Sequence, residues 1–548
     1  MLAMDKKNTG MSMAIWLLIA LMAVGWVLTA WVADDAYITF RTIDHFWKGY
    51  GLRWNIDERV QVFTHPLWMM LLSIVGYPFR ELYYSSLALS AACVAGTITL
   101  LYRHAASQWQ LIIGLLVLLS SRAFLDFSSS GLENPLLYLL GTLMVIQLSG
   151  FYSNSTQSGL GKLTLLMSLL FITRMDSILL FIPPYLYCVI SSLSARSLGK
   201  QLAPLLLGAL PAIGWSLFSI FYFGSFIPNT AWAKLNTGIG KSQLLAQGFD
   251  YYWANLVFDP VTLCALTILL VMALVSRHSI KKLIGLGCFI TLSYIASIGA
   301  DYMYGRFLSV LLVIMIADLA VDVEIRFKET AFSKYGRYFL VSLLAILTIR
   351  QLPNWNPSVF RGSINVHNGM ADERGFYYFG TGLWRVIHGT AIPKKIMFRW
   401  YVDPQKLSPN LLAPLPNIGM FPYLAPDSAI FIDPLALSDP FLAQHPMRPG
   451  FWRQGHFERS FSMDYLISRA SGVNQLKDPD DYAVLEDVWL ATRAPLFAKG
   501  RLGAIWRINT GQTKKQAFRA FSRYKFEKMS PRFFPKQSDR VWYGPYRP

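Results

Sequence analysis

Two adjacent carboxylates, Asp34 and Asp35, come directly after an apolar stretch that begins at residue 12. Carboxylates can take a proton from a hydroxyl group, and two neighbouring acids raise each other's pKa toward the range that a general base needs. A simpler interpretation is also open, because an aspartate at the start of a helix can cap its free N–H groups. Both interpretations place the pair where a hydrocarbon core gives way to water.

A guanidinium group, Arg306, lies five residues after Asp301 in the segment DYMYGRF. Its planar fork can hold a phosphate through two parallel hydrogen bonds, although an arginine at a membrane boundary can also serve only as an anchor. With Asp301, the side chains that could assist it in binding a phosphorylated sugar are Arg41, His65, Arg174 and Lys234.

Three further polar residues lie in short segments between apolar runs. Glu133 is in SSSGLENP, Asp176 follows Arg174 in TRMDS, and Asn229 is in FGSFIPNTAWAKL. Taken singly, such residues are typical of loops, turns and caps. Together they are candidates for lining a cavity or binding an acceptor. The sequence has no phosphate-binding glycine loop, dinucleotide fingerprint, zinc-type Cys/His spacing or nucleophile elbow.

The elements that must position these residues are membrane helices. The chain has 548 residues, of which 54% are hydrophobic and only 15% charged, which is far too apolar for a soluble enzyme of this length. Apolar runs of span length recur from residue 12 to about residue 350. The sequence therefore predicts a polytopic α-helical membrane protein.

The basic residues between the apolar runs predict the orientation. About eleven spans account for them best, at 12–31, 82–101, 110–125, 135–150, 162–174, 177–193, 202–223, 256–275, 283–299, 304–322 and 338–350. With this count the basic loop residues fall on the cytoplasmic side, while the candidate site residues all fall outside. The polar residues then converge on one face, which predicts an organised extracytoplasmic site.

Three local features refine this scheme. The segment after Asp35 has aromatic and polar residues at helical spacing, which is typical of an amphipathic helix on the membrane surface. The apolar run 66–79 is short for a span and is interpreted as interfacial or re-entrant. Eleven residues before Arg174 rise only about 17 Å as a helix, so Arg174 and Asp176 are expected to line a cavity that dips into the membrane.

The chain divides near residue 350. Residues 1–350 form the predicted transmembrane catalytic domain, and residues 351–548 form a predicted extracytoplasmic α/β domain with strand-like runs such as SAIFID and GAIWRI. The four cysteines all lie in apolar runs, so no disulfide holds the second domain. The net charge of +18 reflects the basic loops and the tail, and nucleic acid is not an expected partner.

Several ordered motifs resemble those of GT-C membrane glycosyltransferases: DDAYITFR, GYGLRWNIDERVQVFTHPLW, SSGLENPL, TRMDS, FGSFIPNTAWAK and GADYMYGRF. The resemblance is to the group of the mycobacterial terminal arabinofuranosyltransferase and Gram-negative pilin arabinosyltransferases, and it extends through residues 419–443. His65 stands where this group usually has Asn, Ala300 replaces a Gly, and TRMDS replaces a Thr-Arg-Pro-acid-Gly motif. These departures leave the sugar and the acceptor open.

The resemblance implies a GT-C fold and an enzyme that moves a sugar, with arabinofuranose expected, from a polyprenyl monophosphate carrier to a hydroxyl of an extracytoplasmic glycan or protein. It also implies a multi-pass protein of the bacterial inner membrane with its site facing the periplasm. By analogy, Asp34 is expected to be the general base, with Asp35 orienting the sugar or capping the helix, and the two roles could be reversed. No cofactor besides the lipid-linked donor is expected. A divalent cation near the acids is compatible with carboxylate chemistry, but no ligand spacing specifies one.

Two other classes of function use similar features. A flippase or transporter of lipid-linked sugars also needs charges within the membrane and an entrance for lipid, although such proteins often contain internal repeats, and no second copy of the acid-bearing segment occurs. A GT-C enzyme that uses another polyprenyl-phosphate sugar would carry the same residues. A scaffold without catalytic activity is disfavoured by the presence of the acids and Arg306.

Overall fold

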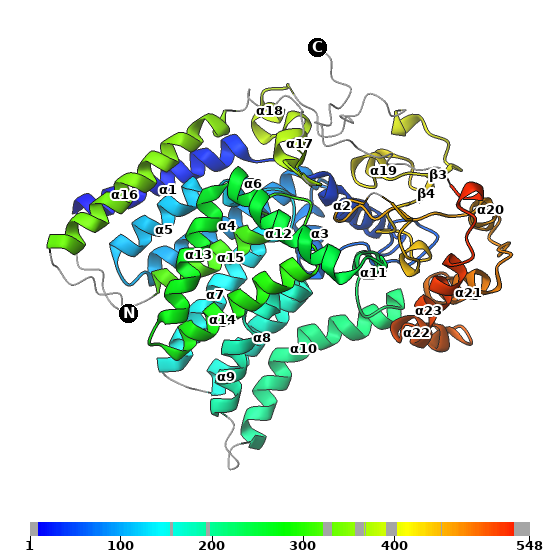
Figure 1. Ribbon diagram of the computed structural model, residues 1–548, viewed down its shortest axis with the longest axis horizontal. Coiled ribbons are helices and arrows are strands. Elements are labelled where there is room, and N and C mark those ends of the chain that lie inside the picture. The colour runs from blue at the N-terminus through cyan, green and yellow to red at the C-terminus, as the bar shows by residue number, and fades with distance from the viewer. Residues whose placement is uncertain are drawn as a thin grey trace.

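The computed structural model describes residues 9–153, 157–192, 198–321, 331–356, 366–367, 369–390, 403–450 and 452–530. Most of the described residues are helical, and Figure 1 shows a bundle of long helices with a mixed region along one side and one end. The short strands lie outside the bundle. The structure is thus that of a helical protein, as the apolar periodicity predicts.

Five described helices are long and apolar enough to cross a membrane. They are α1 (Thr9–Thr29), α4 (Tyr83–His104), α7 (Asn134–Ser153), α10 (Leu198–Phe223) and α14 (Ser279–Ser297). A sixth candidate is a bent pair, α12 (Lys241–Phe258) and α13 (Pro260–Val275), whose axes differ by 113°. The expected count of about eleven spans is not confirmed for the described residues, because several of the predicted spans are shorter helices.

The other helices of the N-terminal part are short or medium in length. They are α2 (Asp34–Trp47), α3 (Pro66–Gly76), α5 (Gln108–Ser120), α6 (Arg122–Phe127), α8 (Gln157–Thr173), η1 (Met175–Leu180), α9 (Ile182–Ser192), α11 (Asn229–Leu235), α15 (Arg306–Ala320), α16 (Ala331–Gln351) and η2 (Leu352–Trp355). The amphipathic helix after Ala33 and the short helix after His65 both form as predicted. The predicted span 256–275 is wrong at its start, because Asp259 caps α13 and Pro260 begins it.

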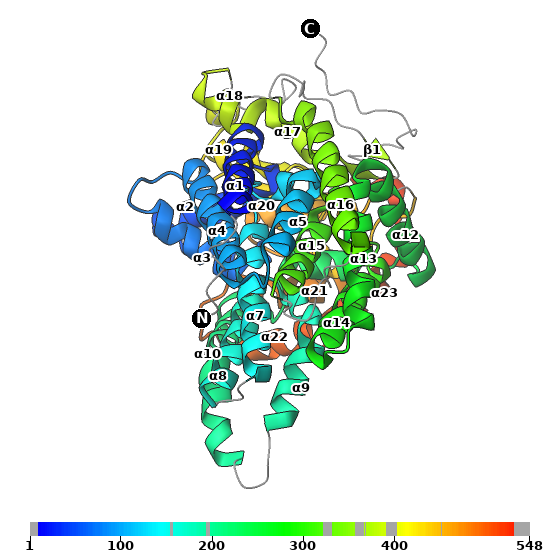
Figure 2. The ribbon, with the colours of Figure 1, turned by 90° about the vertical axis from the view of Figure 1, so that its left-hand side faces the viewer.

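A common core of apolar side chains joins α4, α5, α7, α13, α14 and α15. Helix α15 lies inside this core and is buried along almost its whole length, so its first residue, Arg306, is held rigidly. Helices α8 and α10 pack against each other, and Figures 1 and 2 show α10 extending away from the bundle beside α9. Their close approach uses Gly208, where a Cβ atom would lie 2.7 Å from the Gly161 carbonyl oxygen.

The C-terminal region is mainly helical where it is described. Its helices are α17 (Glu373–Thr381), α18 (Leu383–Ile387), η3 (Pro404–Lys406), α19 (Met420–Leu424), η4 (Leu442–Gln444), α20 (Met463–Ser471), α21 (Pro479–Thr492), α22 (Arg501–Asn509), α23 (Gln512–Phe521) and η5 (Phe526–Lys528). Strands β1 (Val366–His367) and β2 (Met370–Ala371) pair antiparallel, and β3 (Leu412–Pro414) and β4 (Ile430–Ile432) pair parallel.

One of the two predicted strands is correct. The run SAIFID contains β4, but the run GAIWRI lies in α22. Ala504, Ile505 and Ile508 are buried there, whereas Trp506 is 66% exposed, so the apolar residues follow the spacing of a helix stripe. Six residues are too few for periodicity to separate a strand from a helix.

The C-terminal region is docked directly onto the segment that contains α2. The Asn55 side chain exchanges two hydrogen bonds with the backbone of Phe431, at 3.0 and 3.1 Å. The Arg469 guanidinium donates to the buried Glu58 carboxylate at 2.6 Å. Helix α2 therefore lies between the bundle and the C-terminal region, and both parts fix the direction of its two aspartates.

Candidate active site

The two aspartates at the start of α2 point to different partners. Residue Ala33 precedes the helix, and no side chain caps it. The expectation that one aspartate caps its own helix is therefore wrong. Asp34 is 7% exposed and accepts a hydrogen bond of 2.8 Å from the backbone N–H of Met420. It caps the start of α19, and burial raises its pKa to about 7.

The contact between Asp34 and α19 leaves no space at Gly419. A Cβ atom at Gly419 would lie 2.2 Å from Asp34 Oδ2 and 2.3 Å from the Asp34 carbonyl oxygen. We expect Gly419→Ala to lower the free energy of unfolding by about 2 kcal/mol and to reduce activity, because α2 must shift. A thermal unfolding curve measures the first effect. The control is Gly214→Ala in α10, where a Cβ would meet no atom within 4 Å, and equal stability of the two variants would contradict this account.

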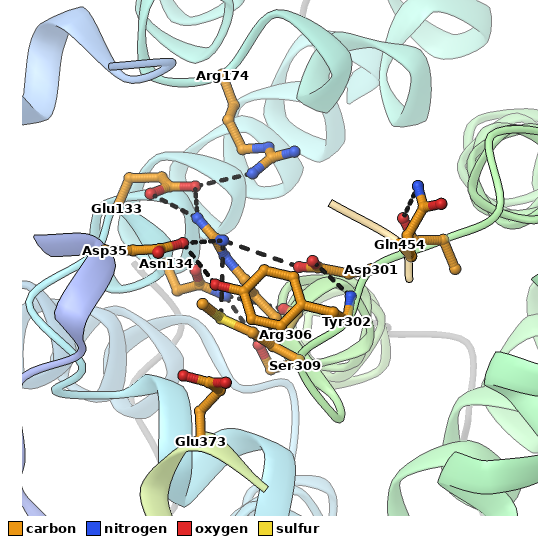
Figure 3. A network of polar contacts seen from close by, with 12 residues as sticks. Asp35, Glu133, Asn134, Arg174, Asp301, Tyr302, Arg306, Ser309, Glu373 and Gln454 are labelled. Carbon is orange, nitrogen blue, oxygen red and sulfur yellow. Dashed lines mark hydrogen bonds and ion pairs between the residues drawn. The ribbon is translucent and has the colours of Figure 1, made fainter. Parts of the chain in front are cut away.

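Asp35 faces a cluster of charged side chains, shown in Figure 3. Its Oδ2 atom accepts a hydrogen bond of 2.9 Å from the Tyr302 hydroxyl and lies 4.0 Å from Arg306 Nη1. The Asp35 side chain is 32% exposed, so it remains accessible to a ligand. Burial raises the pKa of Asp35, while Arg306 and Tyr302 oppose the rise. A carboxylate in this setting can act as a base.

Arg306 is the centre of the cluster. It is the first residue of α15 and follows Gly305, which has φ +74°, and a Cβ there would lie 2.5 Å from Ala123. Its Nη2 atom donates to both Glu133 oxygens at 3.1 and 3.3 Å, and its Nη1 atom lies 3.8 Å from Asp301. The segment before it contains Ala300 at φ +60°, a conformation that favours glycine.

Glu133 is fully buried and contacts two arginines and a histidine. Besides Arg306, it accepts a hydrogen bond of 3.0 Å from Arg174 and lies 3.1 Å from His65 Nδ1. These neighbours hold the pKa of Glu133 well below its usual range, so it is a permanent anion. His65 is fixed on its other side by Thr39, at 2.9 Å. Glu133 thus orients the arginines of the cluster rather than facing solvent.

A cavity extends from this cluster between α7, α8, η1, α14 and α15. Its polar end is bordered by Glu133, Arg174, Asp176 and Arg306, and the rest is mainly apolar, with Leu137, Phe181 and Ile314 among its lining residues. Arg174 binds Asp176 through two hydrogen bonds of 2.7 and 2.8 Å at the break between α8 and η1. The cavity thus has one charged end and an otherwise mainly apolar lining.

Lys234 is in α11, and its side chain is exposed. The charged groups that act on it most strongly are Asp301, Arg306, Arg174 and Asp35. Within the described ranges no carboxylate is at ion-pair distance from its amine. Lys234 is therefore an exposed cation beside the cluster, and its amine is available to an anionic ligand.

Two expected site residues lie elsewhere. The Arg41 guanidinium donates to the backbone carbonyls of Trp54, Pro422 and Ala429, which ties α2 to the loop around α19. The Asn229 amide donates to the carbonyls of Ala436 and Leu437 at 2.9 and 3.0 Å. Backbone carbonyls therefore already use the donors with which Arg41 was expected to assist a phosphate, and the amide with which Asn229 was expected to line a cavity or bind an acceptor.

The structure adds two residues that the sequence did not single out. Glu373, at the start of α17, is 7% exposed and is close enough to Asp35, Asp34 and Asp301 for their charges to act on it. Arg453 lies 3.9 Å from Glu373 and stacks over the Tyr302 ring, with its guanidinium carbon 5.0 Å from the ring centroid. Both come from the C-terminal region, more than 60 residues beyond Arg306 in the chain. No local motif marks them.

Within the described residues, no three His, Cys, Asp or Glu side chains are grouped as metal ligands. The charged cluster is built instead from carboxylates paired with arginines.

No family profile matches the chain. A curated relative, the terminal β-(1→2)-arabinofuranosyltransferase of Mycobacterium tuberculosis, is 26% identical over 421 residues. The match covers 67% of this chain and 66%, just under two thirds, of the relative's own length.

Three solved structures match the chain at low sequence identity. ArnT from Cupriavidus metallidurans in the apo state has a TM-score of 0.47 and 13% sequence identity, and the match covers 79% of this chain and 88% of ArnT. ArnT bound to undecaprenyl phosphate has a TM-score of 0.45 and 12% sequence identity, and the match covers 78% of this chain and 86% of ArnT. The arabinosyltransferase EmbB from Mycobacterium smegmatis has a TM-score of 0.37 and 12% sequence identity, and the match covers 62% of this chain and 37% of EmbB. The similarity to the curated relative confirms the resemblance to GT-C membrane glycosyltransferases that the sequence motifs predict.

Proposed function

We propose that the protein is a GT-C glycosyltransferase that moves a sugar from a polyprenyl monophosphate to a hydroxyl group of an extracytoplasmic acceptor. One observation carries this proposal: Arg306 lies at the polar end of a largely apolar cavity, and its Nη1 atom is 4.0 Å from the Asp35 carboxylate. A fixed cation and a fixed carboxylate stabilise a reaction that separates charge between a leaving phosphate and a sugar ring.

The donor would lie with its polyprenyl tail in the cavity and its phosphate near Arg306. Arg174 and Arg306 both donate to the Glu133 carboxylate, which orients their guanidinium groups before a ligand binds. The exposed amine of Lys234 would also contact the phosphate. The sugar would then extend from the cavity toward Asp35 and Tyr302.

Asp35 is the base in this proposal. The acceptor hydroxyl gives its proton to the Asp35 carboxylate as its oxygen forms a bond to the anomeric carbon. The bond between the anomeric carbon and the phosphate oxygen breaks, and the electron pair leaves with the phosphate, where Arg306 stabilises the added charge. Asp34 is assigned the supporting role, because its carboxylate already binds Met420.

The proposal extends to the sugar, the membrane and the acceptor. Arabinofuranose is the proposed sugar, and the activity in the name of the 26% identical relative supports it. A location in the bacterial inner membrane, with the site toward the periplasm, is supported by the distribution of basic residues between the apolar runs. The acceptor is a glycan or a protein hydroxyl.

The proposal is tested with membranes that contain the protein, radiolabelled polyprenyl phosphoarabinose and extracts of candidate acceptors. Transfer of label into a glycosidic product is the expected result. Labelled lipid that crosses the bilayer without a new glycosidic bond would show a flippase. Transfer only from another polyprenyl-phosphate sugar would keep the enzyme class and overturn the sugar.

Replacing the exposed cation tests the donor site separately. We expect Lys234→Ala to raise the KM for the polyprenyl donor about tenfold, because a charge-assisted contact to phosphate is lost. Steady-state rates at varied donor concentration measure the effect. Lys241→Ala, in the first turn of α12, is the matched control. An unchanged donor KM in Lys234→Ala would contradict the assigned contact.

A further inference from the structure

The backbone around Glu373 is held rigidly against the charged cluster. The flanking residues Asp372 and Arg374 form ion pairs with Arg122 and Asp126 of α6. Asp372 also caps α17 through the Gly375 N–H at 2.8 Å. With both neighbours bound to α6, the position of Glu373 is set by the fold.

A short backbone pairing joins the same segment to Tyr302. The Ala371 N–H donates to the Tyr302 carbonyl at 2.7 Å, and the Tyr304 N–H donates to the Ala371 carbonyl at 3.3 Å. Tyr302 in turn holds Asp35 through its hydroxyl. Glu373 and the proposed base are thus placed relative to each other by a continuous set of hydrogen bonds.

The Glu373 carboxyl has few partners within the protein. It is 7% exposed, and among the described residues it has no side-chain hydrogen bond, while its one ion-pair partner, Arg453, is at 3.9 Å. The buried Nε atom of Arg453 also has no partner in the structure. Figure 3 shows the Glu373 carboxyl directed toward the cluster. A largely buried carboxyl without a side-chain hydrogen bond, beside a buried guanidinium N–H without a partner and next to the charged cluster, indicates a ligand.

We propose that Glu373 and Arg453, with Tyr302 beneath Arg453, form a subsite that binds neighbouring hydroxyls of a carbohydrate acceptor. The subsite rests on the proposed function. Neither Glu373 nor Arg453 lines the cavity proposed for the polyprenyl tail, and we assign both to the acceptor. A carboxyl and a guanidinium side by side match the donors and acceptors of adjacent sugar hydroxyls better than those of a single serine or threonine hydroxyl.

The protonation state of Glu373 adds a pH dependence. Burial raises the pKa of Glu373 to about 8, Arg453 lowers it, and the carboxylates of Asp35, Asp34 and Asp301 raise it. The hydroxyls of Tyr302 and Tyr377 also face it. Below this pKa Glu373 is a neutral acid that can donate a hydrogen bond to an acceptor oxygen. Above it Glu373 becomes an anion that only accepts, so acceptor binding weakens as pH rises.

The test compares KM values for a carbohydrate acceptor at fixed, saturating polyprenyl phosphoarabinose. We expect Glu373→Ala to raise the acceptor KM about tenfold with an unchanged donor KM. Glu373→Gln, which stays neutral and can donate, should keep the acceptor KM within about threefold of wild type. Glu486→Ala, at an exposed carboxyl of α21, is the matched control and should match wild type.

The pH profile separates ligand binding from a structural role. The wild-type acceptor KM should rise as pH passes about 8, and the Glu373→Gln profile should stay flat there. An unchanged acceptor KM in Glu373→Ala, the same alkaline rise in Glu373→Gln, or a serine-containing peptide as the sole acceptor would overturn the inference while leaving the transferase intact. A wild-type protein that transfers no sugar from any polyprenyl donor would refute the proposed function, and this inference with it.

Discussion

Asp35→Asn is expected to lower the turnover of sugar transfer by about 10³-fold, because the amide cannot take a proton from the acceptor hydroxyl. The asparagine can still accept the hydrogen bond from Tyr302, so the cluster should keep its geometry and the donor KM should change little. Initial rates with purified protein, at saturating donor and acceptor, measure the loss.

The neighbouring aspartate provides the matched control. In Asp34→Asn the side-chain oxygen can still accept the Met420 N–H, so the contact with α19 remains. We expect a loss of less than about tenfold in that variant, with a modest change in thermal stability. If Asp34→Asn were inactive and Asp35→Asn active, the base assignment would be reversed.

Arg306→Ala is expected to lower kcat/KM by about 10³-fold, because the charge that develops on the leaving phosphate loses its fixed partner. The substitution also removes a cation from the buried Glu133, so some loss of stability is expected. Thermal unfolding of the same sample shows whether the protein remains folded.

A second variant and a rescue experiment test the role of the Arg306 guanidinium group separately. Arg306→Lys retains the charge but not the planar fork, and an intermediate loss of about 30-fold is expected. Guanidinium ion added to Arg306→Ala should restore part of the rate, since the site of the missing group is adjacent to a cavity. A folded Arg306→Ala protein with normal kcat/KM would contradict the phosphate assignment.

Features that depend on neighbouring residues in the chain could be predicted from the sequence. The amphipathic helix α2, the short α3 and the charged break after α8 follow from spacing and from apolar length, and the structure contains all three. The approach of Asp35 to Arg306 was expected only from their assignment to one face of the membrane. Such topological reasoning brings residues to the same side, but it gives no distance between them.

Other features depend on contacts between distant segments. The side chains of Arg41 and Asn229 donate hydrogen bonds to backbone carbonyls of the loops around residues 422–437. No local sequence pattern indicates these contacts. Asp34 and Asp35 differ because Met420 binds the first, whereas Tyr302 and Arg306 contact the second. Glu373 was missed for the same reason, since its neighbours in the cluster are far away in the chain. The number of spans stays a prediction, because several of the predicted spans are short apolar helices in the described part of the chain, and composition alone does not show whether such a helix crosses a membrane.

The most direct test of the central claim is a structure of the protein with a non-hydrolysable phosphonate analogue of polyprenyl phosphoarabinose. The account predicts that the phosphonate oxygens lie within about 3 Å of Arg306 nitrogens. It also predicts the polyprenyl tail in the cavity between α7 and α15, and the anomeric carbon on the side of Asp35. A phosphonate group bound away from Arg306, or a sugar separated from Asp35 by the protein chain, would contradict it.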